Sequence, residues 1–247
     1  MSALPDDLAE ALARLAARRP LMLASDYDGV LAPLVDDPSA AVALEGIADV
    51  VGRLAAVPEV TVALVSGRGL EDLRTTSGFQ GPFRWIGSHG AEFDGPLRDE
   101  LASRRDALRD QLADVVAGTV GARLEVKPAS VAVHVPQVTD PAAASALLEH
   151  VGSIVDPSLT QKPGKDVLEV AVTDADKGTA LRRLREELGV AGAMYLGDDR
   201  TDEDGFRALA PDDVTVKVGE GATVARYRVT DPAGAFAVLE RLAELLD

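Results

Sequence analysis

Two aspartates one residue apart follow a short apolar segment and are well placed for chemistry. The segment 21–25 leads directly into Asp26, Tyr27, Asp28 and Gly29. A short apolar run that ends in a turn signal predicts a buried strand, and open α/β sheets bind ligands beyond the carboxyl ends of their strands. Two carboxylates this close repel each other unless a cation neutralises them, and Mg²⁺ prefers oxygen ligands of this kind. The pattern indicates a metal-assisted site, although the same residues are also typical of an ordinary turn.

Three further polar groups stand where other predicted elements begin or end. Ser66 follows the apolar strand 60–65, Lys177 begins a predicted helix, and an acidic loop follows the strand 193–196. The loop carries Asp198, Asp199 and Asp202. Hydroxyl and ammonium groups bind anions, whereas clustered carboxylates hold a cation. Taken singly, each group has a plainer interpretation: a cap for Ser66, a solvated charge for Lys177 and a helix-capping turn for the loop.

The elements that must position these groups alternate between strands and helices in two blocks of sequence, 1–96 and 173–247. Such alternation predicts a Rossmann-like, doubly wound parallel sheet. The predicted helices cover residues 4–18, 42–57, 69–76, 177–188, 202–209 and 232–246, and the predicted strands cover 21–25, 60–65, 84–87, 193–196 and 214–218. We expect the two blocks to form one core that is discontinuous in sequence.

The pattern changes over residues 97–172, between the two blocks. A helix followed by two strands occurs there twice, with helices at 98–117 and 140–152. This order predicts an antiparallel sheet with helices on one face. The segment is therefore interpreted as an inserted α+β domain.

Composition and charge argue against several classes of protein. The formal net charge is −16 and the isoelectric point is near 4.6, whereas nucleic-acid binding requires clustered Lys and Arg. Apolar stretches are broken before the roughly 20 residues that a spanning helix needs, and the N-terminus lacks a secretory leader pattern. The absence of cysteine fits a reducing compartment. We expect a cytoplasmic, soluble monomer that binds a small molecule, and neither nucleic acid nor a membrane.

The order of these chemical groups resembles the haloacid dehalogenase superfamily of phosphotransferases over nearly the whole chain. Longer strings resemble one family within it, the trehalose-6-phosphate phosphatases. These strings are residues 26–33, 65–68, 87–92 and 195–206, of which the last is the most diagnostic. The resemblance implies an α/β fold in which a haloacid dehalogenase-like core carries an inserted α+β cap of the C2 type for sugar recognition.

The resemblance also implies a reaction, the hydrolysis of trehalose 6-phosphate to trehalose and phosphate through an aspartyl-phosphate intermediate. This is the last step of trehalose biosynthesis. Asp26 would be the nucleophile, and Asp28 would act as general acid and then general base. Mg²⁺ would be held by the carboxylates of Asp26 and Asp198 and the backbone carbonyl of Asp28.

Other positions take binding roles by the same resemblance. Ser66, Gly67 and Lys177 would bind the phosphoryl group. Two aspartates of the acidic loop, Asp199 and Asp202, would orient Lys177 and the water molecules on the metal. Arg68 would contact the substrate or its phosphate.

Sugar recognition is implied for residues of the inserted domain and of the loop that leads to it. The inserted domain contributes Glu125, Lys127, Lys165 and Glu169. Alternating charges are nevertheless expected on any exposed sheet face. The loop carries His89 and Glu92, which would either touch the substrate or fix the loop.

The inserted domain departs from the family pattern. Pro136 stands where the family usually has an arginine, and the usual Arg-Pro pair after the strand of Glu169 is missing. These changes leave the identity of the sugar open. The alternative substrate is another glycosyl or pseudo-disaccharide phosphate. A noncatalytic sugar-phosphate sensor is less consistent with the sequence, because Asp26 and Asp28 are both present.

Overall fold

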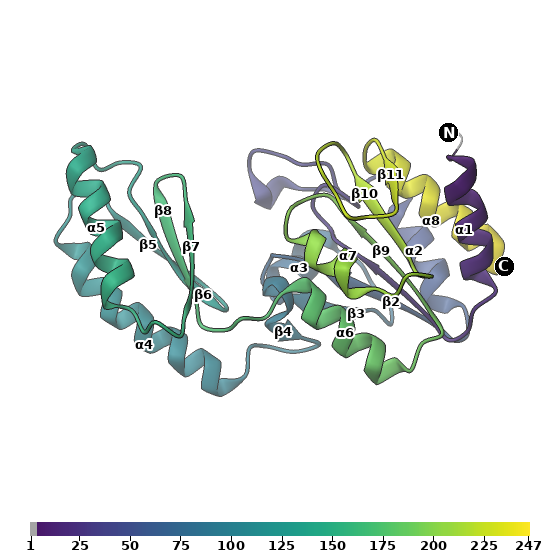
Figure 1. Ribbon diagram of the computed structural model, residues 1–247, viewed down its shortest axis with the longest axis horizontal. Helices are drawn as coiled ribbons and strands as arrows, with labels where there is room; N and C mark the ends of the chain where they lie inside the picture. The colour runs from purple at the N-terminus through teal and green to yellow at the C-terminus, as the bar shows by residue number, and fades with distance from the viewer. Residues whose placement is uncertain (1–3) are drawn as a thin grey trace. The chain divides into compact units, whose positions relative to one another are not determined.

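The computed structural model describes residues 4–247, which fall into two compact units (Figure 1). The core unit comprises Met1–Gly95 and Ala175–Asp247, and the second unit comprises Pro96–Asp174. Each unit has its own sheet.

The sheet of the core unit has the strand order β11-β10-β9-β1-β2-β3-β4 within the described residues. Its strands are β1 Leu21–Ser25, β2 Val60–Val65, β3 Arg84–Gly87, β4 Glu92–Phe93, β9 Gly192–Gly197, β10 Val214–Val218 and β11 Tyr227–Val229. The ladders are parallel except that between β3 and β4. The chain leaves β1 toward β2 and later returns to its other side at β9. Strand β1 is therefore the point where the direction of winding reverses, and ligands bind at such points.

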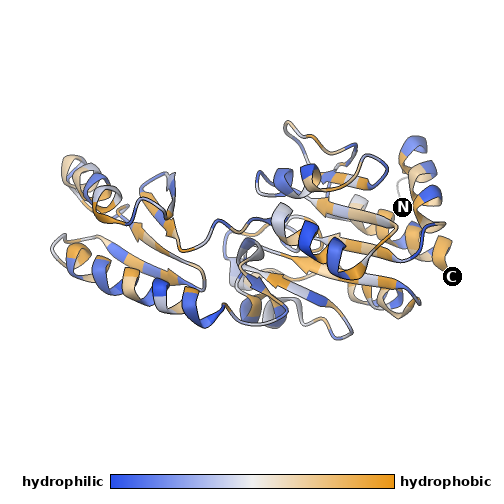
Figure 2. Cartoon of the chain, turned by 60° about the horizontal axis from the view of Figure 1, so that its bottom comes forward, coloured by the Kyte–Doolittle hydropathy of each residue, from blue (hydrophilic) through white to orange (hydrophobic). Residues whose placement is uncertain are grey.

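Helices cover both faces of this sheet. The buried residues of α1 Asp6–Ala16, α2 Ile47–Ala56 and α8 Pro232–Leu246 form one apolar cluster with residues such as Leu23 and Leu196. Those of α6 Lys177–Leu188 and α7 Asp202–Ala208 form another with the alternate strand residues, such as Met22 and Ala193. Figure 2 shows the mainly apolar strands between these helices. The predicted α/β class with a doubly wound parallel sheet is confirmed.

The second unit contains a four-stranded antiparallel sheet in the order β5-β6-β8-β7. Its strands are β5 Arg123–Lys127, β6 Ser130–His134, β7 Thr160–Gly164 and β8 Val167–Ala171. Two helices, α4 Asp99–Ala117 and α5 Pro141–Ile154, lie along one face of the sheet (Figure 1). The other face carries the polar side chains of its strands.

The main difference from the predicted elements lies between β1 and α2. Helix α2 begins at Ile47, five residues later than the predicted 42–57, because Gly46 adopts a left-handed conformation with φ 84° immediately before it. Two short strands, β4 and β11, were not predicted. A further helix, α3 Leu70–Ser77, follows β2 as expected.

Among the described residues, no helix is both long and apolar enough to cross a membrane.

Candidate active site

A cavity of about 370 Å³ opens at the carboxyl ends of β1, β2 and β9 in the core unit. Many of the residues proposed from the sequence line it, namely Asp26, Asp28, Ser66, Gly67, Arg68, His89, Lys177, Asp198 and Asp199. Leu34 and Thr201 also line it. The parallel sheet brings together groups that lie far apart in the sequence, because the carboxyl ends of its strands share one edge.

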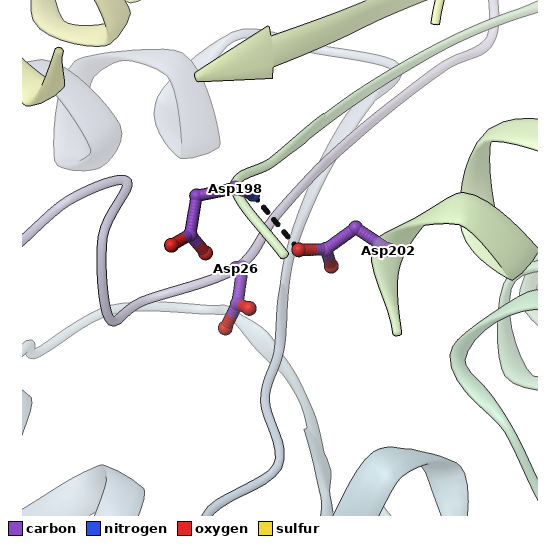
Figure 3. Close-up of side chains that lie close together, drawn as sticks. All are labelled: Asp26, Asp198 and Asp202. Carbon is purple, nitrogen blue, oxygen red and sulfur yellow. Dashed lines mark hydrogen bonds between the residues drawn. The ribbon is translucent and has the colours of Figure 1, made fainter. Parts of the chain in front are cut away.

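Three carboxylates converge beside this cavity, two of them lining it. One oxygen from each of Asp26, Asp198 and Asp202 lies within 4.8 Å of the others (Figure 3). Asp26 continues the line of β1, since its N–H donates to the carbonyl of Leu196 at 3.0 Å. Such a set of oxygen atoms suits a hard divalent cation.

Asp202 is nevertheless fully occupied by protein donors. Its Oδ1 accepts hydrogen bonds from the Lys177 ammonium at 2.7 Å and from the Tyr195 hydroxyl. Its Oδ2 accepts from the backbone N–H groups of Asp198 at 2.8 Å and Asp199 at 3.0 Å. A carboxylate offers about four lone-pair positions. Asp202 therefore orients the loop and Lys177, which leaves Asp26 and Asp198 as the available cation ligands.

Lys177 is buried beside the carboxylates, with its side chain 1% exposed. It is the first residue of α6, where the Asp176 side chain caps the helix by accepting from the N–H of Thr179 at 2.6 Å. Its ammonium donates to Asp26 as well as to Asp202. Burial alone would lower the pKa of Lys177, but the two carboxylates raise it above its ordinary value. The ammonium therefore keeps its charge.

The carboxyl groups of Asp26 and Asp198 both resist ionisation. Burial raises the pKa of Asp26 above its ordinary value, although Lys177 opposes this shift. Burial, followed by the charges of Asp202 and Asp199, raises the pKa of Asp198 to about 6. A cation held between these groups would lower both pKa values and remove the repulsion between them.

Gly29 allows the turn after Asp28 to approach the acidic loop. Its φ of 72° is in the left-handed region, and a Cβ added to it would lie 2.1 Å from Asp198 Oδ2. Any other residue would therefore displace the Asp198 carboxylate.

Arg68 forms a bidentate ion pair with Asp28. Its Nε lies 2.6 Å from Asp28 Oδ2, and its Nη2 lies 2.8 Å from Asp28 Oδ1. The guanidinium also donates to Asp72 at 2.9 Å and to the carbonyl of Pro38 at 2.6 Å. The N–H of Arg68 in turn donates to Ser66 Oγ at 3.1 Å. Arg68 thus ties the loop after β2 to the turn after β1.

The loop after β3 has an unusual backbone at the cavity wall. Ser88 and His89 both have positive φ, 49° and 56°, and such strain in non-glycine residues is frequent at functional sites. Glu92 is buried, and its Oε2 accepts from the N–H of Leu70 at 2.9 Å and from Ser88 Oγ at 2.7 Å. Of the two roles considered for Glu92, these contacts favour fixing the loop. His89 lines the cavity itself.

The sequence profile of the trehalose-phosphatase family matches residues 24–233. The chain belongs to the trehalose-phosphatase family. It is 34% identical over 239 residues to the bifunctional trehalose-6-phosphate synthase/phosphatase of Thermoproteus tenax, with 92% of this chain aligned. It is 33% identical over 273 residues to the trehalose-phosphate phosphatase of Mycobacterium marinum, with 100% of this chain aligned.

The aligned region spans different shares of these relatives. It covers 32% of the Thermoproteus protein and 67% of the Mycobacterium protein. Among solved structures, Aspergillus fumigatus trehalose-6-phosphate phosphatase superposes with a TM-score of 0.77 at 24% identity, over 99% of both chains. This likeness shows a shared fold.

In this member of the trehalose-phosphatase family, the second unit presents charged residues on the open face of its sheet. Lys127 lies 2.9 Å from Glu169, which also accepts from Ser130 Oγ at 2.7 Å. Burial would raise the pKa of Glu169, but the hydrogen bonds from Lys127 and Ser130 hold it below its ordinary value. Glu125 instead pairs with His134 Nε2 at 2.7 Å. Lys165 lies in the turn between β7 and β8.

Sequence reasoning missed two buried residues that hold the acidic loop. Tyr195 donates to Asp202, and the Lys217 ammonium donates to the backbone carbonyl of Asp198. For Lys217 the sequence held a usable signal, because a lysine inside a strand rich in valine, such as β10, needs a buried anion or carbonyl partner. No such signal marks Tyr195, since tyrosine is common in buried strands.

Proposed function

We propose that this protein hydrolyses trehalose 6-phosphate to trehalose and phosphate, using Mg²⁺ and a covalent aspartyl-phosphate. One observation carries the proposal: Asp26, Asp28, Lys177 and Asp198 line one cavity at the carboxyl end of β1. Membership of the trehalose-phosphatase family supports the choice of substrate.

Asp26 is oriented as a nucleophile by two hydrogen bonds. The N–H of Tyr27 donates to Oδ1 at 2.6 Å, and Lys177 donates to Oδ2. Each oxygen keeps a further lone pair. In the first step, an Asp26 oxygen forms a bond to phosphorus while the bond from phosphorus to the sugar oxygen breaks. Water then attacks the phosphorus, which releases phosphate and restores the Asp26 carboxylate.

Asp28 would supply a proton to the departing sugar oxygen and later take one from the attacking water. Both of its oxygens accept hydrogen bonds from Arg68 in the structure. Each oxygen accepts one of these bonds and keeps a further lone pair, which could carry the proton on the side away from the guanidinium.

The phosphoryl group would be held by fixed donors around the nucleophile. An ammonium has three N–H donors, and Lys177 directs two of them at Asp26 and Asp202. The third can reach a phosphoryl oxygen. Ser66 and Gly67 line the same cavity and would donate from the loop after β2. Asp199 accepts from the N–H of Thr201 at 2.7 Å and would keep the acidic loop in shape.

The donor set fits Mg²⁺. Asp26 and Asp198 provide carboxylate oxygens whose ionisation costs free energy without a cation, and the carbonyl of Asp28 is the further proposed ligand. When bound, Mg²⁺ would neutralise charge that develops on the phosphoryl oxygens.

Mg²⁺ should stabilise the protein against heat at about pH 7.5 but hardly at about pH 5. The pKa of Asp198 is about 6 in the folded chain against an ordinary 3.8. The raised pKa of Asp198 therefore stabilises the folded chain most below about pH 3.8, and this stabilisation disappears as the pH rises through about 6. Mg²⁺ binds the ionised carboxylate and restores stability only above that range. At a hundredfold excess over Kd, the melting temperature should rise by roughly 5–10 °C, measured by scanning calorimetry.

Asp198→Asn is the matched control for this pH dependence. It removes the ligand and the titrating group together, so the shift at about pH 7.5 should be largely lost. Equal shifts at both pH values in the wild-type protein would contradict the assignment of Asp198.

The proposed substrate is tested by phosphate release from a panel of phosphate esters. We expect kcat/KM for trehalose 6-phosphate to exceed that for glucose 6-phosphate, sucrose 6-phosphate and p-nitrophenyl phosphate by about tenfold or more. Charged groups suit sugar hydroxyls because they form charge-assisted hydrogen bonds. Within the second unit we assign sugar contacts to Glu125, Lys127, Lys165 and Glu169, and His89 is a separate candidate in the core unit.

Glu169→Gln separates sugar recognition from the chemistry. It should lower kcat/KM for trehalose 6-phosphate and leave kcat/KM for p-nitrophenyl phosphate, which has no sugar, nearly unchanged.

Pro136, which offers no side-chain hydrogen bond, favours the second candidate, a phosphatase of another glycosyl or pseudo-disaccharide phosphate. Turnover of trehalose 6-phosphate no faster than glucose 6-phosphate would select this alternative.

A further inference from the structure

Tyr195 places a hydroxyl group where an apolar residue would be expected. The residue is 0% exposed and lies in β9 among the apolar side chains that face α6 and α7. Its ring centroid lies 5.5 Å from that of Phe206. A buried hydroxyl without a partner destabilises the fold, so this hydroxyl needs a specific acceptor.

The acceptor is Asp202 Oδ1, the same oxygen that accepts from Lys177. Burial, together with the charge of Asp202, raises the pKa of Tyr195 well above its ordinary value, so the phenol remains a donor. Two donors thus share one carboxylate oxygen. The hydrogen bond from Tyr195 fixes the orientation of the Asp202 carboxylate. It also weakens the attraction between this carboxylate and the Lys177 ammonium.

We propose that Tyr195 is a positioning residue, which acts through Asp202 to aim the Lys177 ammonium at Asp26 and at the phosphoryl group. The inference rests on the function proposed above. With Tyr195 absent, Lys177 would be the one remaining described donor to Asp202 Oδ1, and the ammonium would turn toward that oxygen. Its donors to Asp26 and to the phosphoryl group would then be misaligned.

The packing around the ring supports a fixed position for the hydroxyl. A Cβ added to Gly205 would lie 2.4 Å from Tyr195 Cε1. The backbone of α7 therefore closes against the ring, and the hydroxyl has little freedom to leave Asp202.

The test compares Tyr195→Phe with Phe206→Leu, which disturbs the same aromatic pair but keeps the hydroxyl. The dissociation constant of inorganic phosphate is measured by calorimetry with Mg²⁺ present, alongside kcat/KM and the melting temperature. Tyr195→Phe should weaken phosphate binding and lower kcat/KM about tenfold for both trehalose 6-phosphate and p-nitrophenyl phosphate. Phe206→Leu should lower the melting temperature and change phosphate affinity less than about twofold.

Unchanged phosphate affinity in Tyr195→Phe, or an equal loss in Phe206→Leu, would overturn the inference. Should Tyr195→Phe not fold, Gly205→Ala provides a second route, because its methyl group displaces the ring and should produce the same loss. Wild-type protein that hydrolyses p-nitrophenyl phosphate but not trehalose 6-phosphate would refute the proposed function alone. Phosphate binding would still decide the role of Tyr195 in that case.

Discussion

Asp26→Asn should abolish phosphate release and leave the protein at least as stable as the wild type. Loss of a covalent nucleophile typically lowers kcat by at least about 10⁴-fold. Stability should behave differently, because the pKa of Asp26 is raised in the fold. The folded chain thus disfavours the charged carboxylate relative to the unfolded chain, and a neutral amide of the same shape removes that cost. Steady-state kinetics and urea unfolding measure the two effects separately.

A chemical trap distinguishes a nucleophile from a residue that only binds the metal. Borohydride reduces an aspartyl-phosphate to homoserine, so the wild-type protein mixed with substrate should carry homoserine at position 26 in a peptide mass spectrum. The exposed Asp49 of α2 supplies a control, since Asp49→Asn should retain both activity and trapping. Retained activity in Asp26→Asn would rule out the covalent mechanism.

The order of elements and the chemistry at the carboxyl edge could be predicted from local sequence. Strand β2 has the predicted bounds 60–65 because it is an uninterrupted apolar run between turn residues. Helix α6 begins at Lys177 as predicted, since Asp176 and Thr179 form a capping box there. Parallel topology then places Ser66 and Lys177 at the edge that carries Asp26, and this placement can be predicted without knowing their contacts.

The partners of these groups could not be predicted in the same way. Arg68 and Asp28 are 40 residues apart, and their pairing depends on how two loops fold over the sheet edge. Glu92 reaches the N–H of Leu70, a contact that no local pattern specifies. A period of two places Tyr195 on one face of a strand, but its hydroxyl partner depends on the packing of α7. Sequence alone therefore indicates which groups are present, and the tertiary structure determines which of them are already paired.

Lys177→Met should eliminate activity and also destabilise the fold. The lysine side chain is 1% exposed, and it is paired with Asp26 and Asp202, whose side chains are 8% and 0% exposed. Methionine preserves most of the volume but leaves two buried carboxylates without their shared cation. Breaking a buried ion pair from one side costs about 3–5 kcal/mol, a large part of the 5–15 kcal/mol that stabilises a typical domain. Urea unfolding measures the loss. The exposed Lys162→Met should change stability by less than about 0.5 kcal/mol.

A double-mutant cycle separates lost charge pairing from lost packing at this position. In the Lys177→Met background, the Asp26 carboxylate has lost its cation, so Asp26→Asn should be more stabilising there than in the wild type. The sign of this difference is set by electrostatics, because Asn and Asp occupy nearly the same space. If Asp26→Asn changes stability equally in the two backgrounds, the loss in Lys177→Met lies in packing around the lysine stem. A larger stabilising effect of Asp26→Asn in the Lys177→Met background would show that Lys177 favours the ionised Asp26 carboxylate, the form that attacks phosphorus.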